Sequence, residues 1–402
     1  MIHIVDQIMG SGKTQAAINY INNNNNKYIY ITPYLTEVDR IQEQCSFQSP
    51  VKYTSNTPKI IDFKRLLNQG KSIVTTHALF SYFDDEIIDL CYSQGYVLFL
   101  DEVADVVEPY NMTQADLNTM LDRYVDIQDN GLLKWRDESV NTEKYAVERR
   151  LCNMQCLAVY SGCALIWNFP IKIFKAFRES YILTYMFDAQ IQKYYYDFYG
   201  LEYDYMHVEG DSLSTYSFAN GPAVNEHSSL KDLVMILDDK KLNSIGDMDT
   251  ALSKTWYVRN QNNILIKHLK DNVYTFFNNR KVLYDDGRYT QSSAAYNIWT
   301  TFTDFKKQLQ GKGYTKGFIP LNMRATNEYR DRTVVAYLVN RYFNPVVKNF
   351  FSSNNIEVDE ERFALSEMLQ FIWRSGIRDG KKITLYVPSL RMRTLLTKWL
   401  TI

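Results

Sequence analysis

Short apolar runs separated by amphipathic spacers dominate the first hundred residues of the chain. The runs are rich in Ile, Val, Leu and Tyr, and they comprise residues 2–5, 27–33, 72–77 and 96–100. The spacers at 15–21 and 34–41 carry apolar residues at helical spacing. Continuous apolar strands that alternate with helices are typical of a parallel sheet covered on both faces. The pattern predicts an α/β fold.

A second alternating section follows later in the chain. Its predicted strands are residues 233–237, 272–277, 317–320 and 383–388, and residues 357–378 are predicted as a helix that stops at Gly380. Small and breaker residues cluster at 210–222, which predicts a linker. We therefore expect a first domain at residues 1–209 and a second at 223–402.

Between the two strand-rich parts, residues 111–160 are polar, charged and helical in pattern, which predicts a helical insertion in the first domain. A helix at 171–177 and a strand at 181–185 follow. Cys152, Cys156 and Cys163 would share one helical face, and core cysteines explain them better than a metal centre. The tyrosine-rich stretch at 190–205 fits a buried aromatic helix face, with base stacking as the alternative.

The strongest local motif follows the first predicted strand. Residues 9–14 read Met-Gly-Ser-Gly-Lys-Thr and lead into the helix predicted at 15–21. This is the strand, turn and helix context of a P-loop (Walker A motif), in which backbone N–H groups cradle a phosphate. Lys13 would reach the β- and γ-phosphates, and Thr14 would bind Mg²⁺. The full pattern has glycine where this chain has Gln7. The nucleotide-binding residues would be Gly10, Ser11, Gly12, Lys13 and Thr14.

An acidic pair follows the fourth predicted strand. Asp101 can hold Mg²⁺, and Glu102 can take a proton from the water that attacks the γ-phosphate. Thr75, Thr76 and His77 end the third predicted strand. Because ligands of parallel sheets bind beyond the carboxyl ends of the strands, we expect all these residues to meet in one crevice.

Composition and charge distinguish the two halves. The hydrophobic content of 46% and the charged content of 23% fit a soluble globular protein, and five cysteines without a signal segment favour reduced thiols. The net charge is −1, yet residues 301–402 hold 17 Lys and Arg against 9 Asp and Glu. A basic C-terminal quarter on an acidic body predicts a polyanionic partner, with a solvated charged surface as the alternative. No stretch is long enough to predict a membrane span.

The basic quarter contains two candidate anion contacts. Asn322, Arg324, Thr326 and Asn327 follow a predicted strand and offer amides, a hydroxyl and a guanidinium. In the helix predicted at 357–378, three residues recur at steps of four and would project from one face: Gln370, Arg374 and Arg378. An arginine that reaches a γ-phosphate from a neighbouring domain acts as an arginine finger.

In this order, the motifs resemble a superfamily 2 helicase of the DEAD/DEAH-like type, especially the single-chain DNA helicases of tailed bacteriophages. Residues 10–14 resemble motif I and residues 101–104, Asp-Glu-Val-Ala, resemble motif II. Motif Ia is resembled by Pro33 with the helix after it, and motif Ib by residues 75–77. Motif III is resembled by residues 183–185, and motif V by residues 322–327. Residues 370–378 resemble motif VI, with Trp373 in place of its glycine and the second arginine one residue late.

The resemblance implies two RecA-like domains with mostly parallel sheets. The first would bind ATP and Mg²⁺, and the second would supply Arg374 and Arg378 as catalytic arginines and Gln370 as a nucleotide contact. The implied activity is ATP-driven helicase or translocase action on single-stranded DNA or a fork, in phage replication or recombination. Partners would include replication proteins, in the host cytoplasm. The implied nucleic-acid contacts are Thr75, Thr76, His77, Asn322, Arg324, Thr326 and Asn327.

Two other functions stay open at this point. A DNA-packaging ATPase would share the P-loop, but it would carry a nuclease domain with clustered acidic ligands, which residues 223–402 do not show. A nucleic-acid-binding loader that hydrolyses ATP without unwinding would share every motif, because no motif marks the wedge that separates strands.

Overall fold

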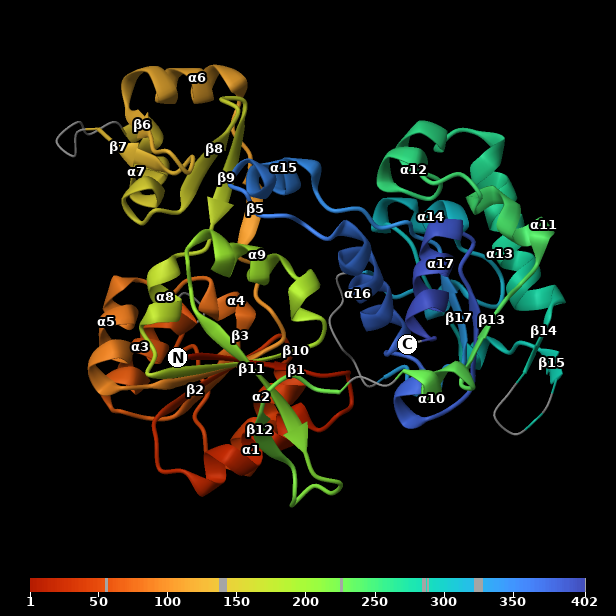
Figure 1. The fold of residues 1–402 in the computed structure, drawn as a ribbon, viewed down its shortest axis with the longest axis horizontal. Coiled ribbons are helices and arrows are strands. Elements are labelled where there is room, and N and C mark those ends of the chain that lie inside the picture. The colour runs from red at the N-terminus through yellow and green to blue at the C-terminus, as the bar shows by residue number, and fades with distance from the viewer. Residues whose placement is uncertain are drawn as a thin grey trace. The chain divides into compact units, whose positions relative to one another are not determined.

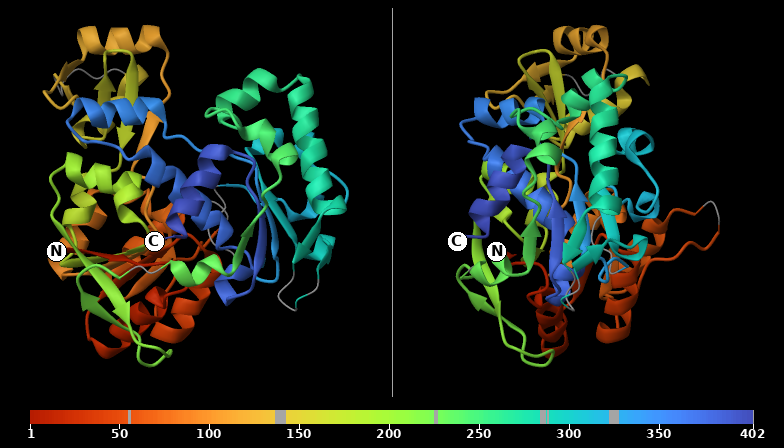
Figure 2. Two further views of the ribbon diagram at one scale, coloured as in Figure 1. Left: turned by 45° about the vertical axis from the view of Figure 1, so that its right-hand side comes forward. Right: turned by 90° about the vertical axis from the view of Figure 1, so that its right-hand side faces the viewer.

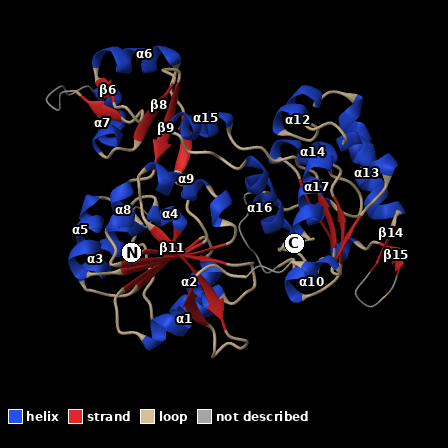
Figure 3. Ribbon diagram, in the orientation of Figure 1, coloured by secondary structure: helices blue, strands red, loops and turns tan. Residues whose placement is uncertain are grey.

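The computed structural model describes residues 1–54, 57–136, 143–224, 227–283, 287, 289–321 and 328–401. The chain divides into two compact units. Unit 1 comprises Met1–Ala223 and Asn344–Val358, and unit 2 comprises Val224–Phe343 and Asp359–Ile402. Each unit has its own mostly parallel sheet with helices on both sides (Figure 3). The predicted α/β fold class is confirmed.

Unit 1 is built on a seven-stranded sheet with the order β12-β11-β1-β10-β4-β2-β3. The strands are β1 (Ile2–Asp6), β2 (Tyr28–Thr32), β3 (Ile73–Thr76), β4 (Val97–Asp101), β10 (Glu179–Thr184), β11 (Tyr203–Glu209) and β12 (Ser217–Asn220). Every neighbouring pair is parallel except β11–β12. The six parallel strands therefore end at one edge of the sheet. Five of them match predicted strands: β1, β2, β3, β4 and β10.

Helices cover both faces of this sheet (Figure 1). On one face, α1 (Lys13–Asn23) and α2 (Leu35–Cys45) pack into a cluster that includes Ile18, Ile41 and Phe99. On the other face, the Phe83 ring contacts those of Phe63 and Phe80, and the Phe80 ring in turn contacts that of Phe174. The helices that carry this side are α3 (Lys59–Asn68), α4 (His77–Phe80), α5 (Asp85–Gln94), α8 (Ile171–Lys175) and α9 (Ile191–Phe198). Burial on both faces explains why β2 is apolar along its whole length.

The tyrosine-rich helix α9 belongs to the core of unit 1. Tyr194, Tyr195 and Tyr196 are all buried, and the Tyr195 hydroxyl donates to the Phe169 carbonyl at 2.7 Å. The side chains therefore fill the interior and are not available for stacking on bases. This confirms the buried aromatic face for α9, whereas Tyr203 and Tyr205 of the same stretch lie in β11 and are partly buried.

An accessory subdomain lies between β4 and β10 in the chain. It comprises an antiparallel sheet of β5 (Val107–Tyr110), β9 (Ala164–Asn168) and β8 (Leu157–Tyr160), a hairpin of β6 (Val125–Ile127) and β7 (Leu133–Trp135), and the helices α6 (Gln114–Arg123) and α7 (Ala146–Asn153). The insertion expected at 111–160 thus contains helices and strands. Its apolar residues form a small core of their own around Met120, Leu133 and Trp135.

The three cysteines of the insertion do not share a helical face. Cys152 lies in α7, which ends at Asn153, whereas Cys156 precedes β8 and Cys163 lies in the turn before β9. The shared-face prediction is wrong because the helix stops before the second cysteine. Cys152 and Cys156 are buried free thiols, and burial raises the pKa of each to about 12.

A single helix from the second half of the chain completes the accessory subdomain. Helix α15 (Pro345–Ser353) begins with the Asn344 side chain accepting the Val346 N–H at 2.9 Å and with Pro345 in its first turn, both favourable at a helix start. Its apolar face packs against β5, β8 and α9. The ring centroids of Phe350 and Phe198 lie 5.0 Å apart.

Residues 344–358, which carry α15, leave unit 2 after Phe343 and return to it at Asp359, and these two points lie close together. The Phe343 N–H donates to the Glu360 carboxylate at 3.0 Å, and the ring centroids of Phe343 and Phe363 are 4.8 Å apart. Contacts within unit 2 therefore join the residues that flank the segment 344–358. The chain passes between the units three times.

Unit 2 has a four-stranded parallel sheet with the order β13-β18-β17-β16. The strands are β13 (Val234–Ile236), β16 (Asn297–Thr300), β17 (Val334–Tyr337) and β18 (Ile383–Tyr386). On one face lie α12 (Lys254–Asn260), α13 (Ile264–Asn279) and α14 (Lys306–Leu309), and on the other lie α16 (Glu360–Ile372) and α17 (Leu390–Trp399). Short elements complete the unit: α10 (Ser228–Lys231), α11 (Lys240–Asn243), and the hairpin β14 (Lys281–Leu283) with β15 (Tyr289–Gln291).

Two predicted strands of the second half are wrong. Residues 272–277 lie in helix α13, whose buried residues recur at helical spacing: Ile266, Leu269, Val273, Phe276 and Phe277. Residues 317–320 follow a 3₁₀ turn, and Phe318 makes an isolated bridge to Trp299. The other two strands of the sheet are instead β16 and β17, which pair with each other, and β17 also pairs with β18. The predicted strands at 233–237 and 383–388 are confirmed as β13 and β18.

The segment expected as a linker lies within unit 1. Residues 210–216 connect β11 to β12, and β12 pairs antiparallel with β11, from Met206↔Asn220 to Glu209↔Ser217. The glycines that suggested a linker serve this hairpin and its exit. The rotated views show the hairpin beside α1 (Figure 2). The division between the units falls after Ala223.

None of the helices described is both long and apolar enough to cross a membrane.

The packing of α15 gives a test of the fold. Phe351 is fully buried and contacts Tyr194, with ring centroids 5.8 Å apart. Replacing such a phenylalanine by alanine leaves a cavity and costs about 3–5 kcal/mol. We expect Phe351→Ala to increase amide hydrogen exchange in β5 and β8 and to lower the unfolding midpoint. The exposed Asn349 on the same helix supplies the control, because Asn349→Ala removes no buried contact. Equal exchange in the two variants would contradict the described packing.

Candidate functional site

The last residue of β1 binds the backbone beyond the neighbouring strand β10. The Asp6 carboxylate accepts the N–H groups of Met186 at 2.7 Å and Phe187 at 3.0 Å. Met186 adopts a positive φ of 53°, which is uncommon for a residue other than glycine. Burial raises the pKa of Asp6, while these two hydrogen bonds and the nearby Lys13 charge oppose that rise. The carboxylate thereby fixes the segment after β10 to the start of the loop 7–14.

Gln7 fixes the other side of the same strand end. Its side-chain Oε1 accepts the Val208 N–H at 2.7 Å, and its Nε2 donates to the Val208 carbonyl at 3.4 Å. Backbone pairing of β1 with β11 ends at Val5↔Met206, so the side-chain amide continues the pairing for one more step. The Gln7 N–H donates to Thr184 on the opposite side, at 3.1 Å. This explains why glutamine stands where the P-loop pattern has glycine.

The loop between β1 and α1 has the conformation that its glycines permit. Gly10 and Gly12 have φ values of 89° and 87°, in the left-handed region that favours glycine. Helix α1 then begins at Lys13, and the Ala16 N–H donates to the Gly12 carbonyl at 2.8 Å. The loop therefore delivers the N-terminus of an eleven-residue helix to the carboxyl edge of the sheet. The positive end of the helix dipole there favours an anion.

The Lys13 ammonium folds back over this loop. It donates to the carbonyl of Gln7 and to that of Ile8, the latter at 3.0 Å. Its charge also lowers the pKa of Asp101, the last residue of β4. Lys13 follows the loop after β1, and β1 and β4 run in the same direction in one sheet, so both residues lie at its carboxyl edge.

Asp101 is a carboxyl in an unfavourable place for a negative charge. Burial raises its pKa to about 8, and the neighbouring charges of Glu102 and Glu37 add to the rise. The residue keeps partial exposure to solvent, so a ligand can approach it. A cation bound beside the carboxylate would supply the missing countercharge.

Tyr30 of β2 is fully buried, and this burial raises the pKa of its hydroxyl well above the usual value. Thr14 lies in the first turn of α1 and Asp101 ends β4, so the two residues predicted to bind Mg²⁺ both lie at the carboxyl edge of the sheet. Among the residues described, no group of three or more His, Cys, Asp or Glu can hold a metal ion. One hydroxyl and one carboxylate suit Mg²⁺ that shares its shell with phosphate and water.

Glu102 has a strained backbone, with φ at 67°. Its N–H donates to the Leu183 carbonyl at 2.9 Å, and two residues later the Ala104 N–H donates to the buried Gln192 side chain at 2.8 Å. These two bonds hold the turn after β4 in one conformation. The backbone of Glu102 is therefore held next to Asp101.

The residues at the end of β3 differ in their access to solvent. Thr75 is buried, whereas Thr76 and His77 are partly exposed. The His77 Nε2 lies 2.9 Å from the Asp101 carbonyl oxygen. His77 is therefore part of the same edge as the acidic pair. The Thr75 side chain is buried, and its nucleic-acid contact stays a prediction.

Gln370, Arg374 and Arg378 do not project from one helical face. Helix α16 ends at Ile372, and Ser375 starts a 3₁₀ turn by accepting the Ile377 N–H at 3.5 Å. The one-face prediction is wrong because the chain leaves the helix after Ile372. Arg374 is buried and Arg378 is exposed.

The buried Arg374 side chain binds backbone. Its Nη1 and Nη2 donate to the carbonyls of Pro320 at 3.2 Å and Leu321 at 3.4 Å. Its guanidinium also lies 5.8 Å from the Phe371 ring centroid. Arg374 thus fixes the chain just before residues 322–327. Those residues, with Asn322, Arg324, Thr326 and Asn327, lie outside the described part of the chain.

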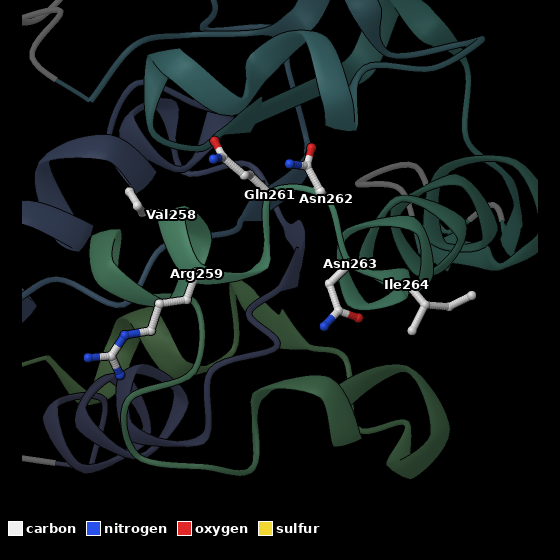
Figure 4. Close-up of a pocket in the computed structure, with 6 residues that line it drawn as sticks. All are labelled: Val258, Arg259, Gln261, Asn262, Asn263 and Ile264. Atoms are coloured by element: carbon white, nitrogen blue, oxygen red, sulfur yellow. The ribbon is translucent and has the colours of Figure 1, made fainter.

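A separate surface hollow lies in unit 2 at the turn between α12 and α13. It has a volume of about 560 Å³ and is lined by Val258, Arg259, Gln261, Asn262, Asn263 and Ile264. The Gln261 and Asn262 amides point to one side and Arg259 to another (Figure 4). The hollow contains none of the predicted site residues.

Sequence reasoning missed Asp6 and Tyr30. Both are polar residues in apolar strands, and polarity at such a position was the available signal.

The bond between Gln7 and Val208 generates a prediction. Gln7→Gly restores the usual P-loop pattern, yet it removes both side-chain bonds and leaves the partly buried Val208 N–H without this acceptor. Loss of a buried partner costs about 1–3 kcal/mol. We expect thermal unfolding to show a lower midpoint for Gln7→Gly. An unchanged or raised midpoint would contradict the role of Gln7 in joining β1 to β11. Gln15→Gly on α1 is a poor control because glycine also weakens a helix. Asn220→Gly at the end of β12 is the matched exposed control.

Comparison with solved structures relates the whole fold to helicases. An apo XPD structure matches with a TM-score of 0.51 at 11% identity and covers 99% of this chain and 95% of that chain. A second XPD helicase structure matches with a TM-score of 0.49 at 10% identity, over 99% of this chain and 94% of the other. At this level of identity, the first match shows a similarity of fold alone.

Sequence comparison gives the family. Residues 228–400 match the family described as the YonV C-terminal Rossmann-like domain. The SPbeta prophage-derived protein YonV of Bacillus subtilis strain 168 is 39% identical over 415 residues, which cover 99% of this chain and 98% of that protein. The chain therefore belongs to the YonV family.

Proposed function

We propose that this protein is an ATP-dependent nucleic-acid helicase or translocase that acts on single-stranded DNA in phage replication or recombination. The observation that supports the proposal is a glycine-rich loop that leads from the end of β1 into α1, with Lys13 and Thr14 at the helix start and Asp101 at the end of the parallel strand β4. An ammonium, a hydroxyl and a carboxylate at the end of a glycine-rich loop suit a nucleoside triphosphate with Mg²⁺. The helicase-type fold and the prophage-derived relative support the nucleic-acid part.

The loop 7–14 would hold the phosphates. Backbone groups around Gly10 and Gly12 would surround the β-phosphate at the N-terminus of α1. Lys13, which donates to the Gln7 and Ile8 carbonyls, would turn to the β- and γ-phosphates. Bound Mg²⁺ would neutralise phosphate charge and would be held by Thr14 and Asp101.

Glu102 would act on the attacking water. Its carboxylate would accept a proton from the water as the γ-phosphate transfers, which is general-base catalysis. The backbone bonds of Glu102 to Leu183 and of Ala104 to Gln192 hold the turn that carries this residue. Because the Glu102 N–H donates to the Leu183 carbonyl near the end of β10, a movement of Glu102 on loss of the γ-phosphate would shift residues 183–185.

Nucleic acid would bind along the phosphodiester backbone with weak sequence preference and strong salt dependence. Thr76 and His77 are the exposed candidates in unit 1, and His77 contacts Asp101 directly. In unit 2, we propose Asn322, Arg324, Thr326 and Asn327, which follow in the chain after the Pro320 and Leu321 carbonyls that Arg374 binds. Gln370, Arg374 and Arg378 would contribute to the nucleotide site from the second unit.

ATP hydrolysis with and without single-stranded DNA or RNA tests the proposal. We expect single-stranded DNA to stimulate the wild-type protein. Lys13→Ala should lower kcat/KM by about 10²-fold or more because it removes transition-state charge stabilisation. Glu102→Gln should lower kcat by about 10²–10⁴-fold while nucleotide still binds. Glu43→Gln, an exposed carboxylate on α2, is the matched control. Hydrolysis that is indifferent to nucleic acid would contradict the helicase and translocase proposal.

The two arginines are separable by experiment. Arg374→Ala should lower both the unfolding midpoint and hydrolysis, because the guanidinium holds two backbone carbonyls in a buried position. Arg378→Ala should lower stimulated hydrolysis and leave the midpoint unchanged, because Arg378 is exposed. Arg362→Ala, an exposed arginine on α16, controls for loss of positive charge. Full stimulated hydrolysis in both variants would contradict a contribution of unit 2 to the nucleotide site.

A further inference from the structure

The loop that joins β11 to β12 lies beside the candidate nucleotide site. β11 runs parallel to β1, so its end at Glu209 lies at the same edge of the sheet as the loop 7–14. The antiparallel β12 starts at Ser217, and residues 210–216 therefore cross this edge. The sequence alone predicted a linker here, and the proposed function assigns no role to residues 210–216.

Tyr216 of this loop contacts the phosphate-loop sequence directly. A Cβ atom built on Gly12 would lie 2.8 Å from three carbons of the Tyr216 ring. The ring therefore fills the space that a side chain at position 12 would need. Tyr216 also keeps partial exposure to solvent, so the ring covers Gly12 without being enclosed.

Hydrogen bonds hold the loop against α1. The Asn19 side-chain amide donates to the carbonyls of Leu213 and Tyr216, both at 2.9 Å. Inside the loop, the Thr215 hydroxyl accepts the N–H groups of Asp211 at 3.2 Å and Ser212 at 3.0 Å. Tyr216 is thus a positioned aromatic side chain and belongs to a built loop.

The order of strands gives the direction in which a nucleotide would lie. β4, with Asp101 and Glu102, lies on one side of β1, and β11 and β12 lie on the other. A triphosphate whose γ-phosphate approaches Asp101 and Glu102 has its α-phosphate and nucleoside directed away from them. The nucleoside then emerges on the side of β11, where Tyr216 lies against Gly12.

We infer that Tyr216 is the platform on which the base of the bound nucleotide stacks. The inference rests on the proposed nucleotide site and adds its base-binding residue. An aromatic platform accepts any base by its π-face, and purines offer the larger area. The polar groups of the loop already bind one another or α1, as Thr215 and Asn19 do. The site therefore takes purine nucleotides with little discrimination between adenine and guanine.

Calorimetric binding of ADP, GDP and inorganic pyrophosphate to the full-length protein tests the inference. ADP and GDP carry a base and pyrophosphate does not. We expect wild type to bind ADP and GDP with affinities within about threefold of each other, as stacking tolerates either base. Tyr216→Ala should weaken ADP and GDP by about 10-fold or more and leave pyrophosphate unchanged. Tyr216→Phe should retain wild-type affinity, and Tyr92→Ala, at an exposed tyrosine on α5, controls for loss of an aromatic ring.

The outcomes separate the inference from the function on which it rests. Unchanged ADP affinity in Tyr216→Ala overturns the platform while the nucleotide site stands. An equal loss for ADP and pyrophosphate also overturns it, because the ring would then only support the loop 7–14. If wild type binds neither ADP nor pyrophosphate, the proposed function fails, and the platform fails with it. In hydrolysis assays, a raised KM with little change in kcat supports the platform.

Discussion

The end of β1 is the constraint on which the rest of unit 1 depends. Asp6 binds the backbone after β10, and Gln7 binds Thr184 on one side and Val208 on the other. Strand β1 is thereby joined to both of its neighbours at the residue where the glycine-rich loop starts. Because Gly10 and Gly12 need a defined path at positive φ, this anchoring sets where Lys13 and the N-terminus of α1 lie.

Electrostatics at the same edge explain why a ligand is expected there. The pKa of Asp101 is raised to about 8 by burial and by the charges of Glu102 and Glu37, and the nearby Lys13 opposes the rise. A site with this imbalance gains from a cation at the carboxylates and from an anion at the helix N-terminus. A nucleotide with Mg²⁺ brings both charges at once. The strained φ of Glu102 is consistent with a backbone held for function.

Much of this arrangement could be predicted from the sequence. The apolar runs identified β1 to β4 and β10, and parallel pairing then placed Lys13 and Asp101 at one edge. The strand predicted at 272–277 was wrong because aromatic residues favour strands, whereas the longer 3.6-residue period through Ile266 and Phe276 determines the helix. The packing partner of helix α15 could not be predicted from the sequence. Its apolar face indicates that the helix is buried, but it does not identify Phe198 as the residue against which the helix packs. Tyr216 was missed because glycine-rich turns of hairpins and linkers look alike.

Hydrogen exchange with and without Mg²⁺ and ADP tests the central claim most directly, because it locates bound nucleotide without depending on turnover. We expect ADP to protect residues 7–14, 101–104 and 210–216, which the structure places at one edge of the unit 1 sheet. The turn at 258–264, which lines the hollow in unit 2, should exchange at the same rate in both conditions. Protection of these three segments by ADP is the predicted result. Protection confined to other segments, or none at saturating ADP, would contradict a nucleotide site at the end of β1.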